Sequence, residues 1–89
     1  MTFFFTEPFK RDYGALSEKI QRALDKALQF LLTNARHPSL RAKKLPGTGI
    51  WYGRVSRDYR FTFQFENDVV MLRRAGTHAI LAAERRRKQ

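Results

Sequence analysis

The chain has 89 residues, 43% hydrophobic and 13% aromatic, which suits one small folded domain over residues 1–89. Its 18 lysines and arginines outnumber 8 acids, and the net charge of +10 predicts a polyanionic partner, either nucleic acid or an acidic protein. Because the chain has no cysteine and no long apolar run, we expect no disulfide, no thiolate metal site, no membrane contact and a cytoplasmic location.

The N-terminal part of the chain predicts a strand followed by two helices. Residues 2–5 are a short aromatic run, which we expect to be a buried first strand. Thr6 is suited to cap a helix over residues 7–16. Ser17 is a second helix cap, and apolar residues recur after it at three- and four-residue steps until residues 34–38 close the helix. We interpret this stripe as core packing, the alternative being a protein-binding groove.

A basic connection and three strands follow the second helix. Residues 36–49 are basic, short of acids and end in turn residues. Residues 50–55 alternate weakly and residues 59–66 alternate clearly between apolar and polar side chains, as in a strand with one apolar face. Asn67 and Asp68 predict a turn that lets residues 69–75 return as the partner strand. The order β-α-α-β-β-β predicts an α+β fold, with two helices on one face of a small, mostly antiparallel four-stranded sheet and the other face open.

The strand over residues 59–66 places Arg60 on the face opposite three phenylalanines. Arg60 therefore points to the open face if the phenylalanines pack against the helices, and Arg54 can join it from the preceding strand. A two-residue turn places Arg73 on the face of Arg60, whereas a bulge or a longer turn places Arg74 there. The sequence leaves both registers open.

His78 follows Gly76 and Thr77 directly after the last strand, where its side chain can project into a groove. Histidine suits proton transfer near neutral pH, and arginines suit the charge of a phosphodiester transition state. A lone histidine in a loop is nevertheless more often an ordinary surface residue. His37 lies between a helix and a proline and fits a helix end better than catalysis. Two distant histidines without cysteine speak against a zinc site, so we expect neither metal nor cofactor.

Four short motifs follow one another along residues 37–81, namely H-P-S-L at 37–40, K-K-L with a following glycine at 43–47, S-R-D-Y-R at 56–60 and R-A-G-T-H-A at 74–79. Through these motifs the chain resembles the RelE/ParE superfamily of bacterial toxin–antitoxin toxins, and within it the RelE- and YafQ-type endoribonucleases. The resemblance implies a RelE-like fold and a ribosome-dependent toxin that cleaves translated mRNA in the A site, inhibits translation and is neutralised by a cognate acidic antitoxin.

The resemblance also implies a site. Catalytic roles are implied for His78, Arg60, Arg74, Arg54 and Asp58. RNA contacts are expected from the basic residues around them, Lys43, Lys44, Arg41, Arg57 and Arg73. Many relatives carry an aromatic residue shortly after the last catalytic group, where this chain has Ile80, Leu81 and Ala82.

Two other functions stay open at this point. A ParE-like toxin would poison DNA gyrase without catalysis of its own, and a basic RNA- or ribosome-binding module would carry a decayed active site. His78 and Arg60 favour the nuclease, because a ParE-like toxin needs no such pair. New codon-linked 5′ ends in mRNA after induction discriminate the three, since only the nuclease makes them.

Overall fold

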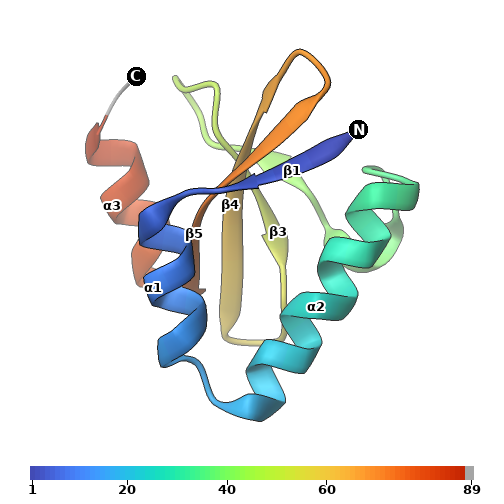
Figure 1. Cartoon of the computed structure of the whole chain (residues 1–89). Helices are drawn as coiled ribbons and strands as arrows, with labels where there is room; N and C mark the ends of the chain where they lie inside the picture. The colour runs from blue at the N-terminus through green and yellow to red at the C-terminus, as the bar shows by residue number, and fades with distance from the viewer. Residues whose placement is uncertain (88–89) are drawn as a thin grey trace.

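A five-stranded sheet forms the centre of the structure, a computed structural model that describes residues 1–87 (Figure 1). Its strands are β1 (Thr2–Phe5), β2 (Lys43–Lys44), β3 (Trp51–Arg54), β4 (Tyr59–Glu66) and β5 (Val69–Thr77). They lie in the order β1-β5-β4-β3-β2, with β1 parallel to β5 and the other neighbours antiparallel. The predicted α+β class and mostly antiparallel sheet are confirmed. Lys88 and Gln89, the end of the predicted domain, lie outside the described residues.

Two helices form where the sequence predicts them. Helix α1 (Glu7–Ala15) begins after Thr6, whose hydroxyl accepts a hydrogen bond from the Phe9 amide at 3.4 Å. Helix α2 (Glu18–Thr33) begins after Ser17, which caps it in the same way. The Thr6 hydroxyl also donates to a carbonyl of β5 at 2.7 Å. The start of α1 is thereby fixed to the sheet.

Helices α1 and α2 pack on one face of the sheet and enclose the main core. The apolar stripe of α2 is buried there, and β4 contributes Phe61 and Phe63, whose rings stack 5.4 Å apart. The buried residues of this core are Phe9, Leu24, Ala27, Leu28, Leu31, Leu40, Phe61, Phe63, Val70, Leu72 and Ala75. Because the phenylalanines of β4 face the helices, the residues that alternate with them occupy the opposite face.

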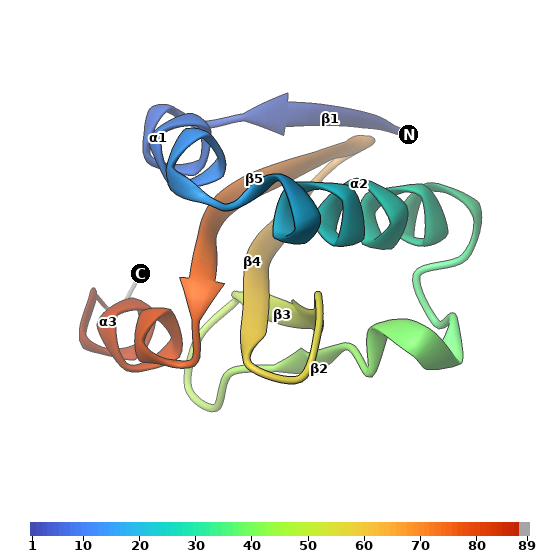
Figure 2. The ribbon, with the colours of Figure 1, turned by 90° about the horizontal axis from the view of Figure 1, so that it is seen from below.

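The second face of the sheet is not open, contrary to the prediction. A third helix, α3 (Ala79–Arg87), packs against β4 and β5, and Figure 2 shows α2 and α3 on opposite sides of these strands. Ile80 and Glu84 lie one helical turn apart and both are buried, so α3 has a short inward face within a basic segment. None of the helices in residues 1–87 combines the length and apolar character needed to cross a membrane.

The edge strands also differ from the prediction. Strand β1 forms where expected, but it is an edge strand rather than a buried one, and Phe4 and Phe5 remain 54% and 41% exposed. Strand β2 consists of two exposed lysines within the predicted basic connection, so the sheet has five strands rather than four. Lysines on an edge oppose pairing with strands of other chains. The same connection contains a short 3-10 helix, η1 (Pro38–Leu40).

Candidate functional site

One end of the sheet brings together four of the five residues predicted to be catalytic. Arg54, the last residue of β3, pairs with Arg60 on β4, and Arg60 also pairs with β5. Tyr59 pairs with the last residue of β5, and His78 follows that residue at the same end of the sheet. We define the basic end of the sheet as Arg54, Arg57, Asp58, Arg60 and His78.

The guanidinium of Arg60 is held by the turn between β3 and β4. Its Nη1 donates hydrogen bonds to the carbonyls of Ser56 at 2.7 Å, Tyr59 at 2.8 Å and Arg57 at 3.2 Å. Within residues 1–87 these bonds use Nη1 alone, so Nε and Nη2 stay available to an anionic ligand. The partners are neutral carbonyls, which orient the positive charge without cancelling it.

The surroundings of Arg60 lower the pKa of its guanidinium. Burial is the largest cause, and the positive charges of Arg54 and Arg41 act in the same direction, whereas Tyr52 and Asp58 act against them. Like charges held close together repel each other, and an anion bound among them would remove that repulsion. The basic end therefore favours a phosphate or another anionic group beside Arg60.

His78 lies in the connection between β5 and α3, and its side chain is exposed. Its carbonyl accepts a hydrogen bond from the Leu81 amide at 3.0 Å, which ties the backbone of His78 to the first turn of α3. Arg57 and Asp58 are exposed in the turn before β4, at the same end of the sheet. An accessible imidazole at this position can exchange protons with a phosphodiester held by the arginines.

Arg74, the fifth residue predicted to be catalytic, is bound to helix α1. Its Nε donates to Asp12 at 2.6 Å, and Asp12 also accepts a hydrogen bond from the Ala75 amide at 3.0 Å. The hydrogen bond with Asp12 raises the pKa of Arg74, and burial opposes this effect only in part. Arg74 thus forms an ion pair that joins α1 to β5. Its catalytic role stays a prediction.

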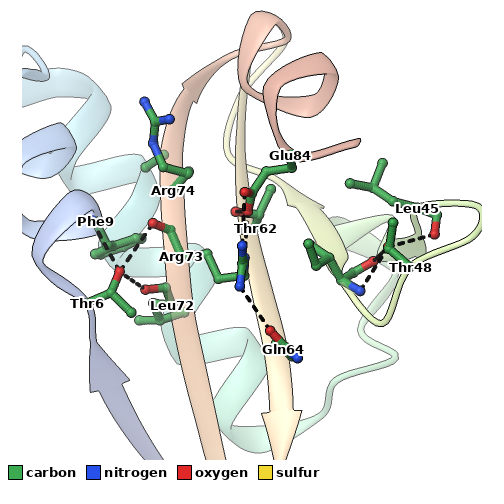
Figure 3. A network of polar contacts seen from close by, with 12 residues as sticks. Thr6, Phe9, Leu45, Thr48, Thr62, Gln64, Leu72, Arg73, Arg74 and Glu84 are labelled. Carbon is green, nitrogen blue, oxygen red and sulfur yellow. Dashed lines mark hydrogen bonds and ion pairs between the residues drawn. The ribbon is translucent and has the colours of Figure 1, made fainter. Parts of the chain in front are cut away.

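Arg73 belongs to a buried polar network on the face covered by α3 (Figure 3). Its guanidinium donates to Glu84 at 2.7 and 3.2 Å and to Gln64 at 3.1 Å, and the Thr62 hydroxyl donates to Glu84 at 2.9 Å. A β-bulge between Thr62 and Phe63 shifts the register. Although the bulge is present, Arg73 rather than Arg74 shares the face of Thr62. Its charge is compensated by Glu84, and its contact with RNA stays a prediction.

Three more of the residues predicted to bind RNA lie before β3 and are exposed, namely Arg41, Lys43 and Lys44. Lys43 pairs with Tyr52 and therefore lies on the face of Arg60, whereas Lys44 occupies the opposite face. Arg41 ends η1 in a left-handed conformation with φ 47°, and its charge acts on Arg60. Lys43 and Arg41 thus extend the positive surface of the basic end, and Lys44 does not.

Three further residues near the arginines of the sheet were not predicted from the sequence. Tyr52 is half-buried on β3, and its position two residues before Arg54 was a usable signal, since such residues share a face of a strand. Asp12 and Glu84 hold the arginines of β5. No sequence signal pointed to them, because Asp12 is 62 residues from its partner and Glu84 belongs to an unpredicted helix.

Comparison with known proteins gives matches among solved structures. No family model matches the chain, and no curated protein matches it in sequence. YafQ from E. coli strain BL21(DE3) is 16% identical, with a TM-score of 0.74 over 89% of this chain and 94% of YafQ. A YoeB/ParE toxin from Agrobacterium tumefaciens is 14% identical, with a TM-score of 0.77 over 88% of this chain and 99% of the toxin. A chain of the RelB-RelE antitoxin–toxin complex from Methanococcus jannaschii is 17% identical, with a TM-score of 0.73 over 91% of this chain and 96% of that chain.

These likenesses show that the chain has the fold of the YafQ, YoeB/ParE and RelE toxin structures. The resemblance that the sequence motifs indicated is therefore confirmed at the level of the fold. Folds of this kind can host different functions, so the roles of individual residues have to be argued from their geometry.

Proposed function

We propose that the chain is the toxin of a toxin–antitoxin system and an endoribonuclease that cleaves translated mRNA in the ribosomal A site. The observation that carries this proposal is the pairing of Arg54 with Arg60 at the end of the sheet where His78 follows β5. These residues combine oriented positive charge with an exposed imidazole, a group that can accept and donate protons. Cleavage of translated mRNA would inhibit translation. Because the ribosomes that translate mRNA are in the cytoplasm, we expect the toxin to act there.

The proposed reaction is attack of a ribose 2′-oxygen on the adjacent phosphorus. The 2′-hydroxyl loses its proton to a base, the new P–O bond forms, and the bond to the 5′-oxygen breaks as that oxygen takes up a proton. The products are a 2′,3′-cyclic phosphate and a 5′-hydroxyl. His78 suits one proton transfer, Asp58 is the carboxylate at the same end, and the guanidinium groups of Arg60 and Arg54 stabilise charge on the phosphate oxygens. The scheme requires no metal, because the guanidinium groups supply the positive charge.

The ribosome is the first proposed partner. The basic end is formed by exposed and half-buried side chains at the rim of the sheet. Such a surface can bind a phosphate, but in-line cleavage also requires that the attacking and leaving oxygens are aligned, which contributes a large part of the barrier reduction. We infer that the ribosome holds the mRNA in this alignment.

An acidic antitoxin is the second proposed partner. YafQ has been solved in the DinJ-YafQ toxin–antitoxin complex, and RelE from Methanococcus jannaschii with RelB. The net charge of +10 favours an acidic segment that covers the positive face or displaces the C-terminal residues. Displacement of α3 would break the ion pair between Arg73 and Glu84. We expect the affinity for this antitoxin to fall as ionic strength rises.

Two observations keep other functions in view. One of the similar structures is a YoeB/ParE toxin, which is compatible with a ParE-like toxin that poisons DNA gyrase. Ion pairs also occupy Arg73 and Arg74, which suits a module that binds RNA or the ribosome without cleaving it. Neither alternative uses the exposed His78 beside the paired arginines.

Induction of the chain in a bacterial host tests the proposal. We expect growth arrest with sharp new 5′ ends inside translated frames, detected by primer extension, and no such ends in the same message without a start codon. DNA supercoiling by gyrase in the same cells should be unchanged. Intact message together with inhibited supercoiling would reject the nuclease in favour of the gyrase toxin, and intact message with ribosome binding alone would indicate the non-catalytic module.

A further inference from the structure

A cavity of about 610 Å³ lies on the other face of the sheet from Arg60, between η1 and the strands β3 and β4. Its walls are mostly aromatic and basic, and its lining contains no carboxylate. The aromatic and positively charged side chains of this lining are Arg36, His37, Arg41, Trp51, Phe63 and Phe65. None of them takes part in the cleavage scheme.

His37 gives the cavity a flat wall. Its ring stacks on Phe30 with a centroid distance of 4.0 Å and an interplanar angle of 10°. Phe30 lines a neighbouring cavity and His37 lines this one, so the pair separates the two. The Nδ1 of His37 accepts a hydrogen bond from the Ser39 amide at 3.1 Å, which leaves the proton of the neutral ring on Nε2. A planar ligand can extend this stack and receive a hydrogen bond from Nε2.

Trp51 and Phe65 form a second aromatic wall. Their rings meet edge to face with a centroid distance of 6.2 Å, and Phe65 meets Phe63 in the same way at 5.6 Å. Phe65 remains 41% exposed although it borders a cavity. An exposed aromatic face beside a hollow is a suitable surface for a flat ring, and aromatic side chains of this kind stack on unpaired bases of single-stranded nucleic acids.

Two arginines add positive charge to the aromatic walls. Arg36 and Arg41 line the cavity and are exposed. The charge of Arg41 also lowers the pKa of Arg60, so Arg41, which lines the cavity, is close enough to the basic end of the sheet for its charge to act there. A chain of phosphates can therefore pass from the basic end to the cavity and meet positive charge along the way.

We propose that this cavity binds an unpaired nucleobase of single-stranded RNA, with Arg36 and Arg41 holding its phosphates. The inference deepens the proposed function, because the same RNA would extend from the basic end. An acidic peptide with an apolar anchor is the competing occupant. The parallel His37–Phe30 stack favours a base, since a planar ring gains from a third layer whereas an aliphatic anchor does not depend on ring orientation.

Trp51 reports on the cavity directly, because it is the only tryptophan of the chain. The full chain is titrated at low ionic strength with a 2′-O-methyl hexa-adenylate, which cannot be cleaved through its 2′-oxygen. Abasic hexamer of the same charge and hexaglutamate are titrated in parallel. We expect saturable quenching of Trp51 fluorescence by the hexa-adenylate and little quenching by the other two ligands.

A matched pair of variants tests whether the aromatic wall is responsible. Phe65→Ala should weaken hexa-adenylate binding about tenfold, as expected for the loss of one stacking contact. Phe4→Ala, which removes another exposed phenylalanine from the edge strand β1 on the other side of β5, should leave the affinity unchanged. Both positions are exposed, and circular dichroism confirms that the variants are folded before titration.

Each remaining outcome overturns the inference. Equal quenching by the abasic hexamer would mean that the backbone alone binds, and tighter binding of hexaglutamate would assign the cavity to an acidic protein. Absence of quenching by the hexa-adenylate, or equal affinities of Phe65→Ala and the parent, would also reject it. Cleavage of mRNA in cells without a Trp51 response leaves the proposed function intact, and a Trp51 response without cleavage leaves the cavity assignment intact.

Discussion

Among single residues, the arginines of β4 and β5 differ in what their guanidinium groups contact. Arg73 and Arg74 bind carboxylates, whereas the hydrogen bonds of Arg60 go to neutral carbonyls. A carboxylate neutralises an arginine, but a carbonyl only positions it. Arg60 is therefore the better group to stabilise charge on a bound phosphate. The positive charge of the neighbouring Arg54 repels that of Arg60, and a bound anion would relieve this repulsion.

Substitution of His78 tests proton transfer. We expect His78→Ala to slow single-turnover cleavage of ribosome-bound mRNA by about 10²–10⁴-fold, the usual contribution of a general acid or base. Ribosome binding should persist, because the positive surface is unchanged. Asp68→Ala, at the exposed turn at the other end of the β4–β5 hairpin, serves as the control and should cleave at the parental rate. Parental cleavage by His78→Ala, with loss of cleavage in an Arg54 variant, would assign the proton transfers to the arginines of the basic end.

Substitution of Arg60 tests charge stabilisation. Arg60→Ala should raise the barrier by about 3–4 kcal/mol, as does the loss of other positioned donors, and Arg60→Lys should restore the rate only in part. Lysine keeps the positive charge but has a single nitrogen. It therefore cannot donate to the turn carbonyls through one nitrogen and present further nitrogens to the phosphate in the same plane, as arginine does. Arg85→Ala on the exposed side of α3 is the control for the loss of one positive charge. Equal rates for Arg60→Lys and the parent would show that only the charge matters.

The sequence predicts the surroundings of Arg60 better than those of Arg73 and Arg74. The alternation along β4 is enough to place Arg60 opposite the core phenylalanines, because a regular strand has a fixed period of two. The β-bulge between Thr62 and Phe63 leaves Arg73 as an extra residue on β5, which interrupts the period of two on that strand. No residue type in this stretch specifies a bulge, so the contacts of the two arginines could not be read from the pattern.

At the scale of elements, α3 is the main difference between prediction and structure. Its inward face consists of Ile80 and Glu84. An amphipathic helix is predicted from the spacing of apolar residues, and a buried glutamate does not contribute to that pattern. By contrast, Thr6 and Ser17 marked the starts of α1 and α2 because helix caps act locally. The exposure of β1 also depends on the sheet order, which no local pattern specifies.

Removal of the charge of Glu84 tests how α3 is held. Glu84→Gln should lower the free energy of unfolding by about 3–5 kcal/mol in urea denaturation, because it leaves the largely buried charge of Arg73 without its partner. Glu7→Gln removes one partner of an exposed ion pair with Lys10 and should change stability by less than about 1 kcal/mol.

A double variant separates the ion pair from other effects of this substitution. Arg73→Met combined with Glu84→Gln removes both charges and keeps an acceptor for the Thr62 hydroxyl. It should be more stable than Glu84→Gln alone, since no uncompensated charge remains. If the double variant is less stable than the single one, packing of the Arg73 side chain rather than its charge holds α3.

Two glycines give a matched test of strand and helix packing. A Cβ on Gly53 in β3 would lie 2.7 Å from the Phe61 ring, so Gly53→Ala should destabilise the chain by about 1–3 kcal/mol. Gly14 in α1 has no atom within 4 Å of such a Cβ, and Gly14→Ala should stabilise it by about 1 kcal/mol through helix propensity. Thermal denaturation of both variants measures whether the two changes in stability have opposite signs. A Gly53→Ala variant as stable as the parent would show that the Phe61 ring can move aside at little cost.

In the whole molecule, most of the few acidic residues lie on the three helices, where they form ion pairs or hydrogen bonds. Asp12 and Glu84 bind the arginines of β5, Glu7 and Glu18 pair with lysine or arginine on their own helices, and Asp25 accepts a hydrogen bond from Tyr13. The acids that remain are in turns or at a strand end, namely Asp58, Glu66 and Asp68. Uncompensated positive charge therefore lies over β2, β3 and the start of β4, and also on α3, which carries the exposed Arg85 and Arg86.

This charge distribution predicts which lysines contribute to RNA binding. Each phosphate contact releases counterions, so the logarithm of the affinity should fall linearly with the logarithm of salt concentration, with a slope of about −0.7 per contact for single strands. Lys43 lies exposed on the face of Arg60, and Lys43→Gln should make the slope shallower by about 0.7. Lys10 pairs with Glu7 on α1, and Lys10→Gln should leave the slope unchanged although it removes the same charge. Fluorescence anisotropy of a labelled 2′-O-methyl RNA across a salt series measures both slopes. Equal changes would show that net charge alone binds the RNA, whereas a change for Lys43 only would place the RNA on the face that carries Arg60.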